Sequence, residues 1–531
     1  KPKRKNFMKI VGLACGAHDT AYCVFEDGKT LIHEEYERFS RIKEEQGDVL
    51  KFLFERQEDL DDVKYYSHFF MRWQGGLSNM YPESFSQLQK KLSNNDAEYM
   101  EISHHKAHAA NAFFSSNFEE ALILSLDGGG EECDMVGNKT HETCAAIYKG
   151  RGNKIQKIND MIPLDIGGAW SLITKEVFGL SNGPPIGNQC GTVMAMGAVA
   201  KDPQKFVDQM RNYMESKSRG DFEFFRSLSE EDKFNLAGSL QIVTEEKVIS
   251  LLSSCERFEN LCIVGGVALN GLMNARILNK FDHIKNIYIP PIPYDAGLAI
   301  GCCQYIYYHM LNNTRIISDQ NETPYLGVEY SEDQVLESIK QNKKISYINA
   351  SDDDVLDLLK NQKIVSIFNG RSESGRRALG NRSIFADPRS PDMKDMINEK
   401  VKHRQWFRPF APVILREDVK DWFVNDVDSP YMNIISLFKE DKKSEVPAVV
   451  HHDGTGRFQS VKESDNFWLY NFLTKWKEKS GVPILLNTSF NDREPIVETP
   501  ENAINCFLKT EIDYLYFPEH EIIVEKCQSD A

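Results

Sequence analysis

The sequence lacks any apolar run close to the ~20 residues that a membrane-spanning helix needs. No charged segment followed by an apolar one opens the chain, and we expect its basic residues 1–6 to be a tail or added residues rather than a targeting signal. The eleven cysteines include no CxxC pair, which argues against a zinc knuckle and against a disulfide framework. We therefore expect a cytoplasmic protein with reduced, mostly buried thiols and no membrane partner.

Basic residues are also outnumbered by acidic ones, 63 against 79, which gives a formal net charge of -16. That balance argues against broad attraction to nucleic acid, although it leaves room for a local basic site. The rest of the composition, 41% hydrophobic and 27% charged, is typical of a globular protein. At 531 residues the chain exceeds one ordinary hydrophobic core, so we expect two or more domains.

Two segments of the N-terminal half share one pattern: an apolar strand, a tight loop of glycine and aspartate, and a returning strand. Strands are expected at 9–15, 21–25 and 30–36 in the first segment, and at 121–126, ending in the loop 127–130, and 143–148 in the second. Asp-Gly turns of this kind are typical of β-hairpins. The repetition predicts a duplicated α/β domain that closes around a nucleotide or metal site. Chance similarity of two hairpins is the alternative.

Further buried strands are predicted at 261–264, 287–289, 363–368 and 482–486. The last two run into loops of polar residues, which is where α/β proteins normally carry their sites. Residues 320–341 are expected to cross into a second domain.

His104 and His108 are four residues apart at the start of a small-residue helix, so both imidazoles lie on one face and can bind one metal ion. An isolated HxxxH is a weak signal, and a surface or capping pair is the alternative. Asp127 and Asp295, at strand-to-loop junctions, favour the metal, because two imidazoles and a carboxylate suit Fe(II), zinc or manganese. His105 lies on another face and can instead be structural.

His18 and Asp19 lie in the first strand turn. They are candidates for a general base or a substrate-orienting group, with a plain turn pair as the alternative. Gly-rich turns at 187–192 and 265–267 would let a ligand approach the backbone closely, although ordinary turns show the same pattern.

Cations cluster in the C-terminal half. Four arginines lie within residues 370–383, and further basic residues follow at Lys400, Lys402, Arg404, Arg408 and, in another Gly-rich turn, Arg457. In an acidic chain, such cations at the ends of core strands indicate a phosphate site rather than a solvated basic face.

These ordered motifs resemble the O-carbamoyltransferase family of nodulation-factor, cephem and aminoglycoside-type enzymes. The similarity runs from Ile10 to about Tyr514, and its most specific parts are GRSESGRRALGNRS, NEKVKHRQWFRPFAP, HHDGTGRFQ and VPILLNTSFN. The resemblance implies an α/β chain with a duplicated actin-like (ASKHA-type) domain at residues 8–340 and a YrdC-like α/β domain at residues 341–531.

In chemical terms, the resemblance implies that the YrdC-like domain makes carbamoyl adenylate from carbamoyl phosphate and ATP with Mg2+. The actin-like domain would then transfer the carbamoyl group to an acceptor hydroxyl, with Fe(II) or another divalent metal in its cleft. Clustered cations suit the phosphates, and a metal suits the polarised carbonyl. The acceptor is left open between a sugar or antibiotic hydroxyl and a hydroxymethyl-pyrimidine nucleotide or DNA, as is a homodimer.

We assign site residues by motif position. His104, His108 and Asp295 are the expected metal ligands, and His18, Asp127 and Arg377 the expected catalytic residues. The expected residues for binding ATP and carbamoyl phosphate are Arg377, Arg382, Lys402, Arg404, Arg408, Arg457, Asn487, Gly265, Gly266 and Asn270. One departure is Arg376, which stands where the family usually has proline and adds a charge to that loop.

Two rival functions fit parts of this pattern. A tRNA threonylcarbamoyl transferase shares the N-terminal fold, but the fused half with RALGNRS argues against it. A non-catalytic nucleotide-binding module or ATP-gated chaperone of the actin-like group would bind ATP without carbamoyl phosphate-dependent AMP release.

Overall fold

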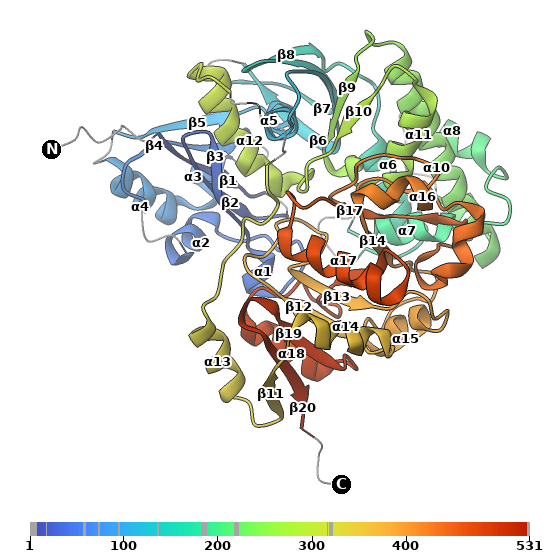
Figure 1. Cartoon of the computed structure of the whole chain (residues 1–531). Helices are drawn as coiled ribbons and strands as arrows, with labels where there is room; N and C mark the ends of the chain where they lie inside the picture. The colour runs from blue at the N-terminus through green and yellow to red at the C-terminus, as the bar shows by residue number, and fades with distance from the viewer. Residues whose placement is uncertain are drawn as a thin grey trace. The chain divides into compact units, whose positions relative to one another are not determined.

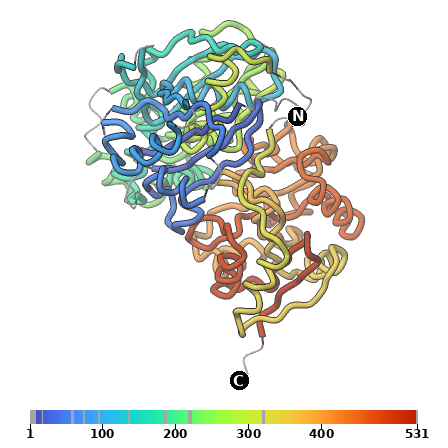
Figure 2. The backbone as a smooth tube through the Cα atoms, turned by 90° about the vertical axis from the view of Figure 1, so that its left-hand side faces the viewer, coloured from blue at the N-terminus to red at the C-terminus, as the bar shows by residue number. Residues whose placement is uncertain are grey.

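The computed structural model describes residues 8–16, 18–56, 60–72, 75–93, 96–134, 137–181, 188–216, 222–315, 317 and 322–527. Residues 1–6 and Gly187, which the sequence analysis singled out, lie outside these ranges. Figures 1 and 2 trace the chain through two compact units, Lys1–Ser40 with Glu44–Glu322, and Arg41–Lys43 with Thr323–Ala531. Across the described ranges, no helix is both long and apolar enough to cross a bilayer.

The first unit contains two five-stranded sheets with the same topology. Their strand orders are β3-β2-β1-β4-β5 and β8-β7-β6-β9-β10, and in each sheet an antiparallel three-stranded meander is followed by two parallel strands. The strands are β1 Lys9–Ala14, β2 Ala21–Glu26, β3 Lys29–Glu35, β4 Val63–Phe69, β5 Glu98–Ile102, β6 Glu120–Cys133, β7 Lys139–Arg151, β8 Lys154–Asn159, β9 Asn260–Val264 and β10 Asn286–Tyr288. The repeated topology confirms the predicted duplication and is that of an actin-like α/β fold.

Strand β6 corrects one expectation, because it does not end at Asp127. It continues to Cys133, and its register against β7 shifts between Leu126 and Gly130. The long partner strand β7 supplies pairing on both sides of the irregularity, so the glycines form a bulge within the sheet rather than a loop. The bulge leaves Asp127 projecting from the middle of a strand.

Two equivalent helices connect the repeats. Helix α5 (His104–Ser115) follows β5 but packs on β6 and β9, whereas α12 (Leu298–Gln304) follows β10 but packs on β1 and β4. The helices also pack against each other, and this is close at Gly301, where an added Cβ would lie 1.9 Å from the Ala107 carbonyl oxygen. Small residues at this crossing bring the beginnings of both helices toward one place.

The longer helices of the first unit outside this pair are α2 Val49–Arg56, α4 Pro82–Ser93, α6 Ile166–Glu176, α7 Cys190–Gly197, α8 Val207–Glu215, α10 Glu230–Ser253 and α11 Gly271–Lys280. Helix α10 packs against α7, α8 and α11. Ser229 caps α10 and Asn270 caps α11 through their side-chain oxygens, as expected for these residue types at helix starts.

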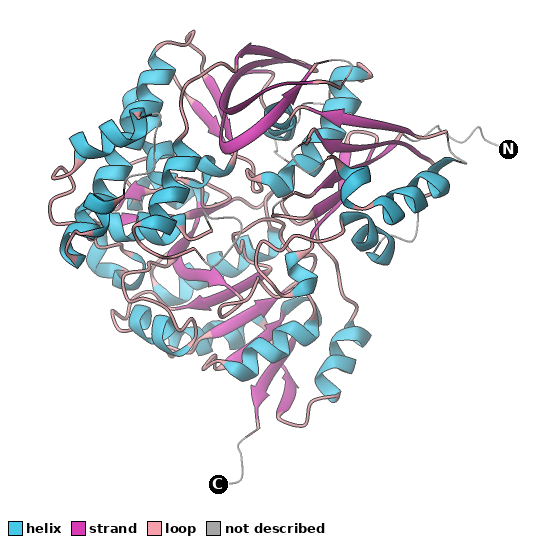
Figure 3. Cartoon of the chain, turned by 180° about the vertical axis from the view of Figure 1, so that it is seen from behind, coloured by secondary structure: helices cyan, strands magenta, loops and turns pink. Residues whose placement is uncertain are grey.

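The second unit is built on one eight-stranded mixed sheet, in the order β11-β20-β19-β12-β13-β18-β14-β17. The strands are β11 Ile345–Asn349, β12 Val365–Phe368, β13 Arg382–Ala386, β14 Ala411–Leu415, β17 Gln459–Val461, β18 Ile484–Ser489, β19 Tyr514–Phe517 and β20 Ile522–Lys526. Helices α14 Asp352–Lys360, α17 Phe467–Ser480 and α18 Pro500–Lys509 pack on these strands. Figure 3 distinguishes the helices from the strands along the chain. Helix α13 (Glu332–Lys340) packs on α18 and β11, so the expected crossing at 320–341 already lies largely in this unit.

Candidate functional site

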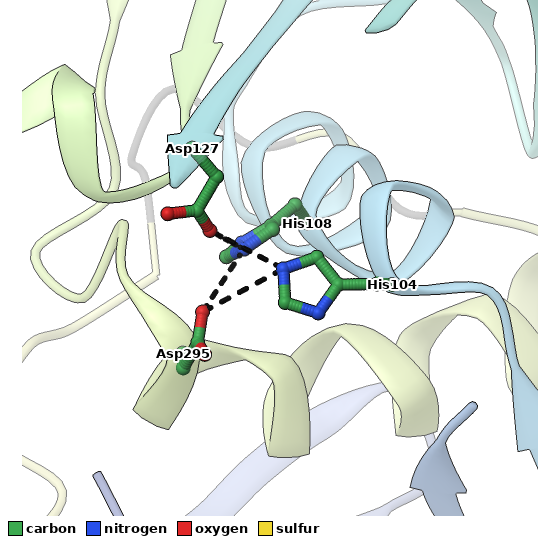
Figure 4. A group of neighbouring side chains, drawn as sticks. All are labelled: His104, His108, Asp127 and Asp295. Carbon is green, nitrogen blue, oxygen red and sulfur yellow. Dashed lines mark hydrogen bonds and ion pairs between the residues drawn. The ribbon is translucent and has the colours of Figure 1, made fainter. Parts of the chain in front are cut away.

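Four side chains from three elements of the first unit meet at one point (Figure 4). His104 and His108 come from α5, Asp127 from the bulge of β6, and Asp295 from the 3-10 turn η2 (Asp295–Gly297) that begins α12. One nitrogen or oxygen of each lies within 4.8 Å of the others. The His108 Nε2 atom is 2.8 Å from Asp127 Oδ2 and 3.4 Å from Asp295 Oδ1. The structure therefore brings the three predicted ligands together and adds Asp127 to the set.

The two carboxylate oxygens of Asp127 have separate partners. Oδ1 accepts the backbone N–H of Gly128 at 2.7 Å and that of Gly266 at 3.4 Å. Oδ2 is thereby left to face His104 at 3.2 Å and His108 at 2.8 Å. This geometry places Asp127 among the metal-binding side chains, whereas the sequence analysis assigned it a catalytic role.

The cluster is electrostatically organised around its two carboxylates. Burial alone would lower the pKa of His108, but hydrogen bonds to Asp127 and Asp295 raise that pKa to about 9. Burial would likewise raise the pKa of Asp127, yet His104 and His108 hold it well below its usual value. The protonated His108 imidazole thus lies against both carboxylates, at a place that a cation can take. Two imidazole nitrogens and two carboxylate oxygens are donors that fit a divalent first-row ion.

His18 lies beside this cluster. Its Nδ1 atom is 2.7 Å from Asp19 Oδ2, and its Nε2 atom is 3.9 Å from Asp295 Oδ2. Asp19 is buried and has a φ of 55°, a backbone conformation that is uncommon outside glycine. The Asp19 carboxylate orients the imidazole, so that Nε2 faces the metal-binding group.

Three residues that the sequence analysis missed hold Asp295 in place. The His33 Nε2 atom lies 2.9 Å from the carbonyl oxygen of Ala296, and the Tyr294 hydroxyl donates to Glu35 Oε2 at 2.6 Å. Residues of strand β3 are thus hydrogen-bonded to the residues immediately before and after Asp295. No local motif marks such residues, although the alternation of β3 places His33 and Glu35 on one face.

The other Gly-rich turn of this unit mainly serves the fold. Gly265 has a φ of 91°, and an added Cβ would lie 2.0 Å from the Leu126 carbonyl oxygen. Asn270 caps α11 and exchanges hydrogen bonds with Gln241.

His105 has a structural role. Its ring nitrogens are hydrogen-bonded to the Ser125 hydroxyl and the Thr143 carbonyl, and burial lowers its pKa to about 3.

The second unit gathers three arginines, Arg404, Arg408 and Arg457, near one another. Burial lowers the pKa values of Arg404, Arg408 and Arg457, and the charges of Arg404 and Arg408 lower that of Arg457 further, to about 10. Arg404 donates to Asn398 Oδ1 at 2.7 Å. The side chains of Arg408 and Arg457 have no hydrogen bond or ion pair within the part of the chain that the structure describes. Guanidinium groups held together against their mutual repulsion are suited to a multiply charged anion.

Two other cations that were predicted to bind phosphate, Lys402 and Arg382, are hydrogen-bonded to oxygens of the protein itself. The Lys402 ammonium donates to four oxygens, the carbonyl and side-chain oxygens of Ser489 and Asn491. Arg382 is fully buried, donates to the carbonyls of Asn369, Gly370 and Asn381, and stacks on Phe368. They shape the loops from which Arg377 and the arginine cluster extend.

Loop 370–380 covers one face of the sheet beside Asn487. The Asn487 Nδ2 group donates to the Ala378 carbonyl, and Gln459 Nε2 donates to the Leu379 carbonyl at 3.0 Å. Arg376 and Arg377, immediately before this point, are both partly exposed. Arg377 is therefore on the part of the loop that the sheet face anchors.

Known proteins share both halves of this architecture. A model for the carbamoyltransferase N-terminus matches residues 78–303, and one for the carbamoyltransferase C-terminus matches residues 356–526. Nodulation protein NolO of Bradyrhizobium diazoefficiens is 30% identical over 78% of this chain and 77% of its own length. An uncharacterised protein of Synechocystis is 30% identical over 98% of this chain and 97% of its length. The crystal structure of HypF from T. kodakarensis aligns with 58% of this chain and 48% of its own, at 13% identity and a TM-score of 0.37.

The family models match in the expected order, and the identity to NolO extends across most of both proteins. The chain belongs to the carbamoyltransferase family and is an enzyme of that class.

Proposed function

We propose that this carbamoyltransferase is an ATP-dependent O-carbamoyltransferase that divides its reaction between the two units. The single observation that carries the proposal is the opposite character of their sites. The first unit gathers carboxylates and imidazoles that suit a divalent cation, and the second gathers arginines that suit phosphates. Carbamoyl phosphate and ATP supply the phosphates, and Mg2+ accompanies ATP.

In the second unit, Arg404, Arg408, Arg457 and Arg377 bind the phosphate groups and stabilise the charge that develops during transfer. Carbamoyl phosphate, ATP and one water give carbamoyl adenylate, phosphate and pyrophosphate. A carbamate oxygen forms a bond to the α-phosphorus of ATP while the bond to pyrophosphate breaks. The guanidinium groups take up negative charge on the departing pyrophosphate.

In the first unit, His104, His108, Asp127 and Asp295 would hold Fe(II) or another divalent metal. The metal, when bound, would polarise the carbamoyl carbonyl. His18, oriented by Asp19, takes the proton from the acceptor hydroxyl through its Nε2 atom. The hydroxyl oxygen forms a bond to the carbamoyl carbon, and AMP leaves. His33 and Glu35 keep Asp295 at its place in the cluster.

The acceptor is a hydroxyl of a sugar, an antibiotic or a hydroxymethyl-pyrimidine nucleotide or DNA. A panel of these acceptors, incubated with ATP and carbamoyl phosphate, should yield one product heavier by a carbamoyl group in mass spectrometry. Pyrophosphate release that requires carbamoyl phosphate tests the first half-reaction without knowledge of the acceptor. ATP binding without such release would contradict the proposal.

A further inference from the structure

One edge of the second unit's sheet is open. Strand β11 (Ile345–Asn349) ends the sheet, and among the described strands it pairs only with β20 (Figure 1). The four residues from Ser346 to Asn349 are all exposed, so no described part of the chain covers this stretch of the strand. At the opposite end of the sheet, every residue of β17 is buried. The backbone groups of β11 that face away from β20 are therefore accessible to another strand.

The hydrogen bonds at the two ends of β11 show which of its residues face outward. The N–H of Cys527 donates to the Lys344 carbonyl, and the N–H of Ala350 donates to the Glu521 carbonyl. Because residues of an antiparallel strand alternate between bonding one neighbour and facing the other way, the even-numbered residues of β11 bond β20. The residues whose N–H and carbonyl groups point to the open edge are Ile345, Tyr347 and Asn349. None of these groups has a hydrogen-bond partner within the described chain.

Strand β11 lacks the charges that other edge strands contain. Its sequence, ISYIN, has no charged residue and no proline. In the first unit, the edge strands β3, β5 and β8 contain lysine or glutamate, and β10 has only three residues. Charged side chains and short strands protect an edge from pairing. Tyr347 and Ile348, which point to opposite faces of β11, are 38% and 57% exposed, so the composition of this edge favours pairing with a further strand.

The charges beside β11 indicate which partner fits. Lys343 and Lys344 precede the strand and form no ion pair within the described chain. Three aspartates, Asp352 to Asp354, follow the strand, and one of them pairs with Lys475 at 3.2 Å. If two copies pair antiparallel, the lysines of each copy lie beside the aspartates of the other. Parallel pairing of the same sequence would instead bring like charges together.

We propose that β11 pairs with β11 of a second copy of this chain, antiparallel and centred on Tyr347, and so joins two eight-stranded sheets into one. Ile345 of each copy then pairs with Asn349 of the other, and the two Tyr347 side chains lie directly across from each other. This register uses every open N–H and carbonyl group of the edge. Because a short strand buries little surface, the dissociation constant of the dimer is expected in the micromolar range.

The first test measures the mass of the full chain by light scattering after gel filtration, with samples loaded at about 1 to 200 μM. We expect the mass to rise with concentration from the 60.8 kDa of one chain toward twice that value. One copy at every concentration would overturn the assignment and leave the open edge to a strand of a different protein. Species larger than two copies would also overturn it, because an edge that pairs with itself is used up in a dimer.

The second test examines the register with disulfides. Tyr347→Cys should cross-link two copies under oxidised glutathione, because directly paired residues have Cα atoms about 5.5 Å apart, within the range of a disulfide. Asn349→Cys is the matched control, since its two copies would be separated by four residues along the strand, about 14 Å. Both variants also contain Cys527→Ser, which removes an exposed thiol close to this edge. Equal cross-linking of the two variants, or none in Tyr347→Cys where the wild type is dimeric, would overturn the assignment.

The third test blocks the edge with Tyr347→Pro. This substitution removes an N–H that faces outward and puts the proline ring in its place, while the bonds to β20 are kept. The variant should therefore fold, with an unfolding midpoint within about 5 °C of the wild type. Its dissociation constant should rise by at least about 100-fold. A dimer as tight as that of the wild type would form through another surface and overturn the assignment.

A charge reversal gives the same test without a change to the strand itself. Lys343→Glu combined with Lys344→Glu places acidic residues beside the aspartates of the other copy, so the dissociation constant should rise by about 10-fold. Lys420→Glu reverses an exposed lysine elsewhere in this unit and is the matched control, which should dimerise like the wild type. Equal dissociation constants for the double variant and the control would overturn the assignment, even if Tyr347→Pro does not fold.

Discussion

Each unit brings several side chains of like charge close together, carboxylates in the first unit and guanidinium groups in the second. The first unit places two partly buried carboxylates against the imidazoles of His104 and His108, and the pKa of His108 is raised by them. The second unit collects the guanidinium groups of Arg404, Arg408 and Arg457, which keep their charge in proteins and form no ion pair with a carboxylate among the described residues. The difference teaches that protonation of an imidazole can neutralise the carboxylate charge of the first site before a ligand binds. The positive charge of the second site is neutralised only when an anion binds.

The largest effect that separates the two sites is expected for His108→Ala. The variant removes a buried ligand nitrogen from the metal-binding group, so metal affinity should fall by at least about 100-fold and carbamoyl transfer by about 1000-fold or more. Pyrophosphate release should stay near the wild-type rate. Isothermal titration with Mn2+ and a coupled pyrophosphate assay measure the two quantities, and His283→Ala controls for loss of an imidazole elsewhere in this unit. Loss of pyrophosphate release in His108→Ala would contradict the division of labour.

The next largest effect is expected for Arg457→Ala. Loss of this guanidinium should lower kcat/KM for pyrophosphate release by about 100-fold, and leave Mn2+ affinity unchanged. Removing one of three mutually repelling cations should not destabilise the protein without ligands, so the thermal unfolding midpoint should stay or rise. Arg416→Ala, which removes a surface guanidinium paired with Asp426 at 2.7 Å, is the control and should keep wild-type activity. A lower unfolding midpoint in Arg457→Ala alone would show that this arginine supports the fold.

Lys402→Met sharpens the contrast inside the second unit. Four oxygens of Ser489 and Asn491 accept from the Lys402 ammonium. Without it, the Ser489 carbonyl keeps the Asn491 N–H and Asn491 Oδ1 keeps the Ser489 hydroxyl, but the Asn491 carbonyl loses the Lys402 donor. We expect a loss of about 2–4 kcal/mol in the free energy of unfolding of this unit, measured by urea titration. The KM for carbamoyl phosphate, measured on the folded fraction, should change less than in Arg457→Ala. A large change in KM with unchanged stability would mean that Lys402 binds phosphate, as the sequence analysis expected.

The sequence predicted the histidine and aspartate cluster of the first unit better than the contacts of the cations in the second unit, for a physical reason. Helical spacing puts His104 and His108 on one face of α5, and Asp295 stands at the turn that begins α12, so the packing of α12 on α5 is enough to bring the three together. The ordered motifs also predicted the family and the duplicated fold. Which of several arginines and lysines faces a ligand depends instead on the carbonyls that lie within reach of each, as Arg382 and Lys402 show. Those carbonyls are brought near by the tertiary fold.

Asp127 shows a second limit of local rules. A glycine run after an aspartate predicts a loop, but the partner strand β7 continues past the glycines and makes them a bulge. The support that β3 gives to Asp295 was equally hidden, because His33 and Tyr294 are far apart in sequence. Both features arise from pairing between distant segments.

The smallest predicted effect concerns Glu322, a partly buried acid of the first unit whose carboxylate lies near Thr30, Ser115 and Gln304 rather than at the histidine cluster. Burial raises the pKa of Glu322 to about 7, against a usual value of 4.5, although Thr30, Ser115 and Gln304 donate to its carboxylate. Asp127, also partly buried, has its pKa lowered by two imidazoles. The comparison therefore predicts that the charge of Glu322 weakens the fold, whereas that of Asp127 is balanced.

The pH dependence of stability tests this difference. A carboxyl whose pKa is higher in the folded than in the unfolded chain binds its proton more tightly when folded. Its contribution to stability is present below pH 4.5 and is lost as the pH rises through 7. Glu322→Gln keeps the size and removes the charge, so it should stabilise the protein by about 2 kcal/mol more at pH 8 than at pH 5, which is about 4 °C in the unfolding midpoint. An equal effect of the substitution at both pH values would mean that Glu322 is charged throughout this range and that Arg315 balances it.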